Sequence, residues 1–161
     1  MLIRNIKEFL IKIEEKKIIC LDIGKKKIGL AISDTKHRIS SPLSILKKDK
    51  SLYPNLKNVL TQYEIGGIIV GLPLDENLEF NRMCQFIKDI TKNLDYYLQK
   101  NKFELPIFFW DESYTSFEAM TTTKNFFKNT KSQKKSIDKF AAQIILGDFL
   151  RENIKEHEKK N

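Results

Sequence analysis

The motif IICLDIGKKKIGLAISD at residues 18–34 carries the strongest fold signal in this chain. Ile18–Leu21 is a short continuous apolar run, which is typical of a central strand buried on both faces of a sheet. Residues 28–32 predict a second strand, and the interval between the two strands is short enough for a hairpin. The motif therefore predicts two strands inside a sheet, with the carboxylate of Asp22 directly after the first apolar run.

Outside this motif, predicted strands and helices alternate along the 161 residues. The other predicted strands are residues 37–45, 68–70 and 107–110. The predicted helices are residues 4–15, 52–63, 79–100 and 137–152, with another starting at the capping box of residues 115–118. Pro42 marks an edge or a bulge, Gly66-Gly67 ends the second helix, and residues 128–136 predict a lysine-rich loop. This order predicts an α/β fold with a mixed five-stranded sheet flanked by helices.

The length of the chain fits a single domain, and neither a repeat nor an internal boundary is visible. We expect one domain over residues 1–161. Within it, residues 1–16 form an appended N-terminal helix with a packing role, and residues 17–153 form the core.

The net charge of the chain is +8. A basic surface favours a polyanionic partner, nucleic acid first. The composition offers a second explanation, because lysine dominates the basic residues and Ile and Asn are abundant, which is the bias of an AT-rich genome. The positions of the charges therefore carry more information than their sum.

Nothing in the sequence predicts a membrane span or an export signal. No apolar run approaches the roughly 20 residues that a span needs, and Lys7, Glu8 and Lys12 interrupt any apolar segment near the N-terminus. Cys20 and Cys84 lie in apolar segments and predict reduced core thiols, and no Cys/His cluster has zinc spacing. We expect a cytoplasmic protein without a membrane partner.

Two carboxylates follow predicted strands. Asp22 ends an apolar strand, where its burial requires pairing, hydrogen bonds or a metal. Gly24 permits a tight turn there, or the close approach of a phosphate or metal, although a turn-capping aspartate is the simpler alternative. Glu112 follows the last strand, and ligands gather at the carboxyl ends of parallel strands; a solvated turn residue is its alternative. The adjacent Asp111 should point to the opposite face.

The last predicted helix has an acidic residue on its apolar face. That face is formed at helical spacing by Asp138, Ala141, Ala142, Ile145 and Phe149. The helix dipole favours an acidic residue near the N-terminus, but this alternative does not explain the inward position of Asp138. Asp148 lies about 15 Å further along the helix axis and cannot share a site with Asp138.

Asp22, Glu112 and Asp138 could converge on one point. Three carboxylates together need cations, and hard oxygen ligands select Mg²⁺ or Mn²⁺. Two such ions about 4 Å apart are a known device for phosphodiester hydrolysis. The three residues are therefore candidate metal ligands and candidate catalytic residues of a nuclease.

Basic and backbone groups near these acids are candidate phosphate contacts. The basic candidates are Lys25, Lys26 and Lys27 in the hairpin after Asp22, and Lys131, Lys134 and Lys135 just before Asp138. Each lysine cluster could instead be a solvated turn. Gly71 and Pro73 could present a backbone edge to the substrate, or they could simply end the fourth strand.

Four blocks of sequence together span about residues 18–150. They are Leu21-Asp22-Ile23-Gly24 with residues 27–34, residues 69–74 (IVGLPL), residues 111–116 (DESYTS), and Ile137-Asp138-Lys139 with residues 141–146 (AAQIIL). In order and spacing they resemble the YqgF/RuvX family of pre-16S rRNA nucleases, also described as Holliday-junction-resolvase-like proteins. The resemblance implies an RNase H-like fold with catalytic carboxylates at Asp22, Glu112 and Asp138.

Two stretches depart from the family pattern. Ser113 stands where the family often has Arg, so this chain lacks one group that could bind a phosphate. Residues 75–81 lack the usual glycines, and Arg82 is left as the basic residue of that stretch and as a candidate substrate contact. These departures concern the loops around the substrate and not the metal ligands.

The resemblance implies a Mg²⁺-dependent nuclease that processes the 5′ end of pre-16S rRNA in ribosome biogenesis, with branched DNA as the alternative substrate. A non-catalytic nucleic-acid-binding module is a further alternative, but such a module would be expected to lose the carboxylates. A sugar-kinase or actin-like ATPase also uses an Asp-x-Gly turn, but it needs a second, similar domain. A junction resolvase would want a two-fold dimer, so a monomer and a homodimer are both compatible with the sequence.

Overall fold

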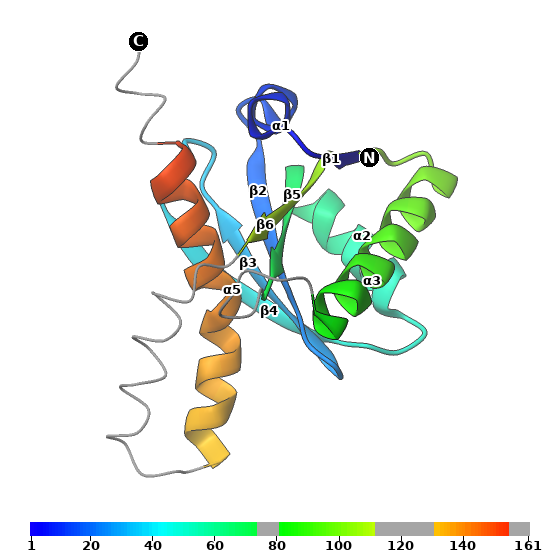
Figure 1. Cartoon of the computed structure of the whole chain (residues 1–161), viewed down its shortest axis with the longest axis vertical. Coiled ribbons are helices and arrows are strands. Elements are labelled where there is room, and N and C mark those ends of the chain that lie inside the picture. Colours follow the sequence, from blue (N-terminus) through cyan, green and yellow to red (C-terminus); the bar gives the residue numbers. More distant parts are fainter. Residues whose placement is uncertain (74–80, 112–130, 155–161) are drawn as a thin grey trace.

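Figure 1 shows a twisted sheet with helices on both of its faces. The computed structural model describes residues 1–73, 81–111 and 131–154, and for residues 131–139 it describes the backbone. The elements in chain order are β1 (Leu2–Ile3), α1 (Ile6–Ile13), β2 (Lys17–Ile23), β3 (Lys27–Ser33), β4 (Ser40–Lys47), α2 (Leu52–Gln62), β5 (Ile65–Leu72), α3 (Arg82–Lys100), β6 (Ile107–Asp111) and α5 (Lys131–Asn153).

Within the described residues the sheet has six strands, in the order β1-β6-β5-β2-β3-β4. The strands β2, β5, β6 and β1 run parallel to one another, whereas β3 is antiparallel to both β2 and β4. This is the α/β architecture with a mixed sheet flanked by helices that the sequence predicted, with one strand more than the five expected. The additional strand, β1, has only two residues, which pair with Ile107 and Phe108. A strand this short has no periodicity to detect.

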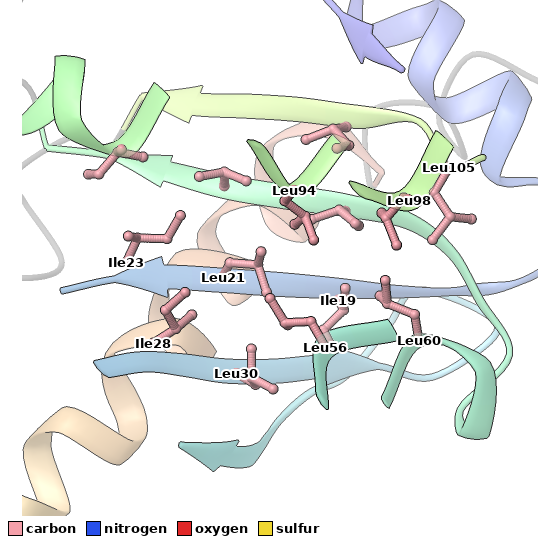
Figure 2. Close-up of a cluster of buried hydrophobic side chains, with 14 of the residues drawn as sticks. Ile19, Leu21, Ile23, Ile28, Leu30, Leu56, Leu60, Leu94, Leu98 and Leu105 are labelled. Carbon is pink, nitrogen blue, oxygen red and sulfur yellow. The ribbon is translucent and has the colours of Figure 1, made fainter. Parts of the chain in front are cut away.

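The alternating side chains of β2 divide the core into two layers. Ile19, Leu21 and Ile23 pack with residues of α2 and α3 in the layer that Figure 2 shows. Ile18 and Cys20 point to the other face and pack with residues of α1 and α5. Ile18–Leu21 are at most 1% exposed, which confirms a central strand buried on both faces.

The edge strand β4 carries the predicted irregularity. It is the last strand in the sheet order, and its register with β3 shifts where Leu30 pairs with Ser44 and Ala31 with Pro42. One extra residue of β4 is therefore accommodated beside Pro42, as in a β-bulge. Both alternatives predicted for Pro42, an edge and a bulge, are confirmed.

Gly66 and Gly67 were expected to end a helix, but they lie inside β5. The preceding helix, α2, ends at Gln62, and Glu64 adopts a left-handed conformation with φ 53° before the strand begins. The two glycines are required by packing instead. A Cβ on Gly67 would lie 2.4 Å from Cγ2 of Ile13, and one on Gly66 would lie 2.6 Å from the Ile13 carbonyl oxygen.

The last helix starts earlier than predicted. Residues 131–136 were expected to form a loop, but α5 begins at Lys131, six residues before the predicted start. Lys and Gln are good helix formers, and the segment contains no Gly or Pro, so its polarity does not oppose a helix. Residues 128–130, 79–80 and the helix predicted to start at Thr115 lie outside the described residues.

Three smaller predictions concern burial and membranes. The N-terminal helix α1 packs through Phe9 and Ile13, which are fully buried in the second core layer. Cys20 and Cys84 are buried thiols, as predicted. Among the described residues, no helix is long and apolar enough to cross a membrane.

Candidate active site

The carboxyl ends of β2, β5 and β6 meet at one edge of the sheet, because the three strands are parallel neighbours. Leu21 pairs with Val70, and Gly71 pairs with Trp110. The register therefore sets Asp22, Gly71 and Trp110 level with one another at this edge. Figure 1 shows the edge at the lower end of the sheet, where the β2–β3 hairpin and the start of α3 also lie.

Asp22 lies on the face of the sheet that α5 covers. It follows Ile18 and Cys20 at the strand period of two, and both of these residues belong to the core layer of α1 and α5. The Asp22 side chain is half-buried, and its backbone pairs with Gly29 of β3. A half-buried carboxylate at the end of a buried strand is an oxygen donor suited to Mg²⁺ or Mn²⁺.

Gly71 stands between Asp22 and β6 on the same face. It follows Ile69, which packs in the layer of α1 and α5. Two strand spacings, about 10 Å, separate the backbones of β2 and β6. Because Gly71 has no side chain, β5 places no side chain between Asp22 and the end of β6 at this level.

Asp111 is the last residue of β6, and it is exposed. It follows Ile107 and Phe109, which pack in the layer of α2 and α3. Alternation therefore turns Asp111 away from the face of Asp22, in agreement with the expectation that only one of the two adjacent acids serves the site. Glu112 itself lies outside the described residues.

The helix α5 covers β2, β3 and β4. Ala141, Ala142 and Ile145 are buried as their helical spacing predicted, and the ring of Phe149 meets Trp110 edge-on at 5.4 Å between centroids. Figure 1 shows α5 beginning beyond the lower end of the sheet and running up its face. Asp138 is in the first third of α5, and its side chain is not among those that the structure describes.

The candidate basic residues occupy three places. Lys25 and Lys26 are exposed in the β2–β3 turn, and Lys27 begins β3. Arg82 is exposed at the first position of α3. The backbone of α5 includes the positions of Lys131, Lys134 and Lys135, which are therefore helical and not in a loop.

Gly24 has the turn role that the sequence predicted. Its backbone N–H donates to the carbonyl oxygen of Lys27 at 2.9 Å, and a Cβ at position 24 would lie 3.0 Å from that oxygen. The carbonyl oxygen of Pro73, a candidate substrate contact, instead accepts a hydrogen bond from Asn81 Nδ2 at 2.9 Å and another from Cys84 Sγ at 3.3 Å. Pro73 thus anchors the start of α3.

The structure adds one basic side chain that the sequence reasoning missed. Lys48 Nζ donates to the carbonyl oxygen of Gly24 at 3.2 Å and lies 3.8 Å from the centre of the Phe86 ring. Burial lowers the pKa of Lys48 below the usual lysine value. The lysines at positions 47, 48 and 50 are visible in the sequence, but their place beside the Gly24 turn depends on the pairing of β3 with β4.

One of the three predicted metal ligands, Asp22, has a described side chain. Among the residues that the structure describes, no group of three His, Cys, Asp or Glu side chains could hold a metal ion. The donor that is present, a strand-end carboxylate, fits a hard divalent cation. The other two donors, at positions 112 and 138, stay predictions.

Sequence comparisons place the chain among known proteins. The model of the family described as "RuvX: Holliday junction resolvase" matches residues 16–152. A Mycoplasma mobile protein named "Putative pre-16S rRNA nuclease" is 36% identical over 134 residues, covering 81% of this chain and 88% of the relative. A Pelagibacter ubique protein of the same name is 32% identical over 152 residues, covering 91% and 97%.

Solved structures are more distant. The Fowlpox virus Holliday junction resolvase superposes with a TM-score of 0.44 at 18% identity, covering 84% of this chain and 99% of that one. RuvC of T. thermophilus in complex with a Holliday junction substrate superposes with a TM-score of 0.41 at 10% identity, covering 60% and 64%. The sequence matches carry the assignment without them: the chain belongs to the RuvX family.

Proposed function

We propose that this chain is a nuclease that uses Mg²⁺ or Mn²⁺ to hydrolyse phosphodiester bonds in pre-16S rRNA. The observation that carries the proposal is the position of Asp22, a half-buried carboxylate at the carboxyl end of the central strand, level with the side-chain-free Gly71. Membership of the RuvX family and the names of its curated relatives support the same activity and substrate.

In this proposal Asp22, Glu112 and Asp138 hold the metal. The alternation of Phe108 and Trp110 in β6 supports a position for residue 112 on the face of Asp22, and helical spacing supports one for residue 138 on the face of Ala141 and Ala142. When bound, the metal supplies a Lewis acid that activates water and stabilises the leaving oxygen. The P–O bond to the sugar oxygen breaks, and water gives its hydroxyl to phosphorus and its proton to the sugar oxygen.

The test is cleavage of matched substrates with Mg²⁺: a 5′-extended pre-16S rRNA, a single-stranded DNA and a four-way DNA junction. We expect cleavage of the RNA, abolished when EDTA replaces Mg²⁺. Asp22→Asn, Glu112→Gln and Asp138→Asn should each abolish cleavage and leave binding largely intact, because the carboxylates hold metal and not the nucleic acid. Near wild-type turnover in any one of them removes that residue from the site.

The chain offers a matched control for two of these variants. Asp111→Asn removes the carboxylate that precedes Glu112 in the sequence and points away from the face of Asp22, and Asp148→Asn removes one that lies on the same helix as Asp138 and pairs with Arg151. Both controls should keep cleavage. Loss of cleavage in the controls as well would mean that the total negative charge, and not a defined metal site, is what the activity needs.

Branched DNA is the second candidate substrate, because the family model is described as a Holliday junction resolvase. A resolvase must cut two strands and would want a two-fold dimer, whereas a processing nuclease does not require one. Sedimentation of the protein with and without substrate separates the two. Binding without any metal-dependent cleavage would instead favour the non-catalytic module.

The remaining proposals concern organisation and location. We assign residues 1–161 to one nuclease domain, with residues 1–16 added to a core of residues 17–153. The buried thiols Cys20 and Cys84 and a ribosomal RNA substrate fit a cytoplasmic protein.

A further inference from the structure

Two lysine-bearing segments that are separate in the sequence meet at the edge that carries Asp22. The antiparallel pairing of β3 and β4 sets Lys27 opposite Lys47. One residue further, the backbone N–H of Lys48 donates to the carbonyl oxygen of Lys26 at 3.0 Å. The β2–β3 turn and the segment after β4 therefore form one continuous surface.

The side chain of Lys48 connects the segment after β4 to the β2–β3 turn. Its ammonium group is held between the Gly24 carbonyl oxygen and the Phe86 ring of α3, and burial lowers its pKa. The side chains of Lys25, Lys26, Lys47 and Lys50 are exposed instead. We call these four residues the lysine edge. The backbone of Lys47 is held by its pairing with Lys27, and that of Lys26 by its hydrogen bond with Lys48, so the lysine edge presents four positive charges beside paired backbone.

The acidic residue nearest to the lysine edge in the sequence, Asp49, is hydrogen-bonded to Ser51. Asp49 is the one acidic residue within residues 24–27 and 47–50. Its carboxylate accepts hydrogen bonds from the hydroxyl and the backbone N–H of Ser51 at 2.6 and 2.9 Å, and these bonds lower its pKa. The two segments thus keep a large excess of positive charge.

We propose that the lysine edge binds the phosphodiester backbone of the nucleic acid next to the bond that is cut. Gly24 is two residues beyond Asp22, about 7 Å along the strand, so the edge begins within about one nucleotide step of the candidate metal site. The proposal rests on the proposed function, because the nucleic acid that the lysine edge binds is the substrate that is cleaved at the site of Asp22.

The same surface predicts binding that does not depend on base sequence. Sequence-tolerant stacking requires exposed aromatic rings. Among the described residues, the large exposed aromatic side chains are Tyr96 and Phe140, and neither belongs to the lysine edge. Contacts to phosphate position a nucleic acid without reading its bases, and each contact makes affinity depend on salt.

The test compares Lys47→Ala/Lys50→Ala with a charge-matched control, Lys7→Ala/Lys12→Ala. The control lysines are exposed on α1, which precedes β2 and lies at the opposite end of the sheet (Figure 1). Fluorescence anisotropy of a labelled RNA duplex with a single-stranded 5′ extension, and of its scrambled counterpart, is measured in EDTA over a range of KCl concentrations. Melting curves confirm that both variants are folded.

We expect the lysine-edge variant to lower the slope of log affinity against log salt by about 0.7 for each phosphate that it no longer binds, equally for both RNAs. The control should keep the wild-type slope. An unchanged slope in Lys47→Ala/Lys50→Ala, an equal decrease in the control, or a decrease confined to one RNA sequence would each overturn the proposal.

Cleavage by the wild type with Mg²⁺, measured on the same RNA, tests the proposed nuclease function independently of the lysine edge. A lowered salt slope in Lys47→Ala/Lys50→Ala without any cleavage by the wild type would support the lysine-edge proposal and contradict the proposed catalytic function. Metal-dependent cleavage by the wild type, together with an unchanged salt slope in Lys47→Ala/Lys50→Ala, would contradict the lysine-edge proposal and leave the nuclease function intact.

Discussion

Gly67 of β5 lies directly against Ile13 of α1, so closely that a Cβ at position 67 would stand 2.4 Å from Ile13 Cγ2 and 2.8 Å from Phe9 Cζ. The absence of a side chain at this point lets the helix rest on the backbone of the strand. Phe9 and Ile13 are thereby buried in the same core layer as α5. The N-terminal helix is tied to the sheet by a close approach that no larger residue at position 67 permits.

Gly67→Ala should therefore destabilise the protein by about 1–3 kcal/mol, the usual cost of overpacking a tight core. Urea unfolding measures the difference. Gly147→Ala is the control, because a Cβ there meets the Ser40 hydroxyl at 3.2 Å, and alanine favours the helix. It should be neutral or stabilising. Equal stability of Gly67→Ala and the wild type would show that α1 can shift away at no cost.

Gly71→Val should lower cleavage at least tenfold while leaving RNA binding in EDTA nearly unchanged. The added side chain would stand level with Asp22 on the face that α5 covers, where the candidate metal site needs space. Gly71→Ala, which adds one methyl group, should lose less activity. Full activity in Gly71→Val would place the reaction elsewhere.

Asp34→Asn should reduce stability at neutral pH and leave stability unchanged in strong acid. Burial tends to raise the pKa of Asp34, but hydrogen bonds from the backbone N–H groups of Ile39 and Arg38 outweigh it, and the pKa lies below its usual 3.8. A lowered pKa contributes stability above the unfolded value, and that stability is lost as the pH falls through the folded value. Unfolding of both proteins at several pH values measures this; a constant difference would contradict it.

Asp138→Asn tests whether three carboxylates really share a site. Without metal they should repel one another, so the variant in EDTA should melt at the same temperature as the wild type or higher, although it is inactive. Mg²⁺ at tenfold its dissociation constant should stabilise the wild type by about 1.4 kcal/mol and the variant by less. A variant clearly less stable in EDTA would make Asp138 a structural helix cap.

Lys134→Ala/Lys135→Ala should weaken RNA binding and lower its salt slope by about 0.7–0.9 for each phosphate that is no longer bound. These positions lie on α5, so any phosphate they bind is held by a helix and not by a loop. The pair Lys7→Ala/Lys12→Ala serves again as the control. A slope equal to that of the wild type would mean that the two lysines only solvate the helix.

The repeating patterns of the sequence predicted the helices and strands well. The apolar run at Ile18–Leu21 predicted the central strand, and the spacing of Ala141, Ala142, Ile145 and Phe149 predicted the buried face of α5. The same patterns placed Asp22 at the end of that strand. These features depend on neighbours within a few residues, where the period of a strand or helix is directly visible.

The packing of distant segments against one another was decided only by the tertiary structure. The sequence alone determined that residues 47–50 include three lysines, whereas its prediction that Gly66-Gly67 end a helix was wrong, because both glycines lie inside β5. The docking of Ile13 on Gly67, the two-residue strand β1 and the meeting of Lys48 with the Gly24 turn required the sheet to assemble. Register and close approach depend on which strands pair across the sheet, and a local pattern of hydrophobic residues contains no information about that partner.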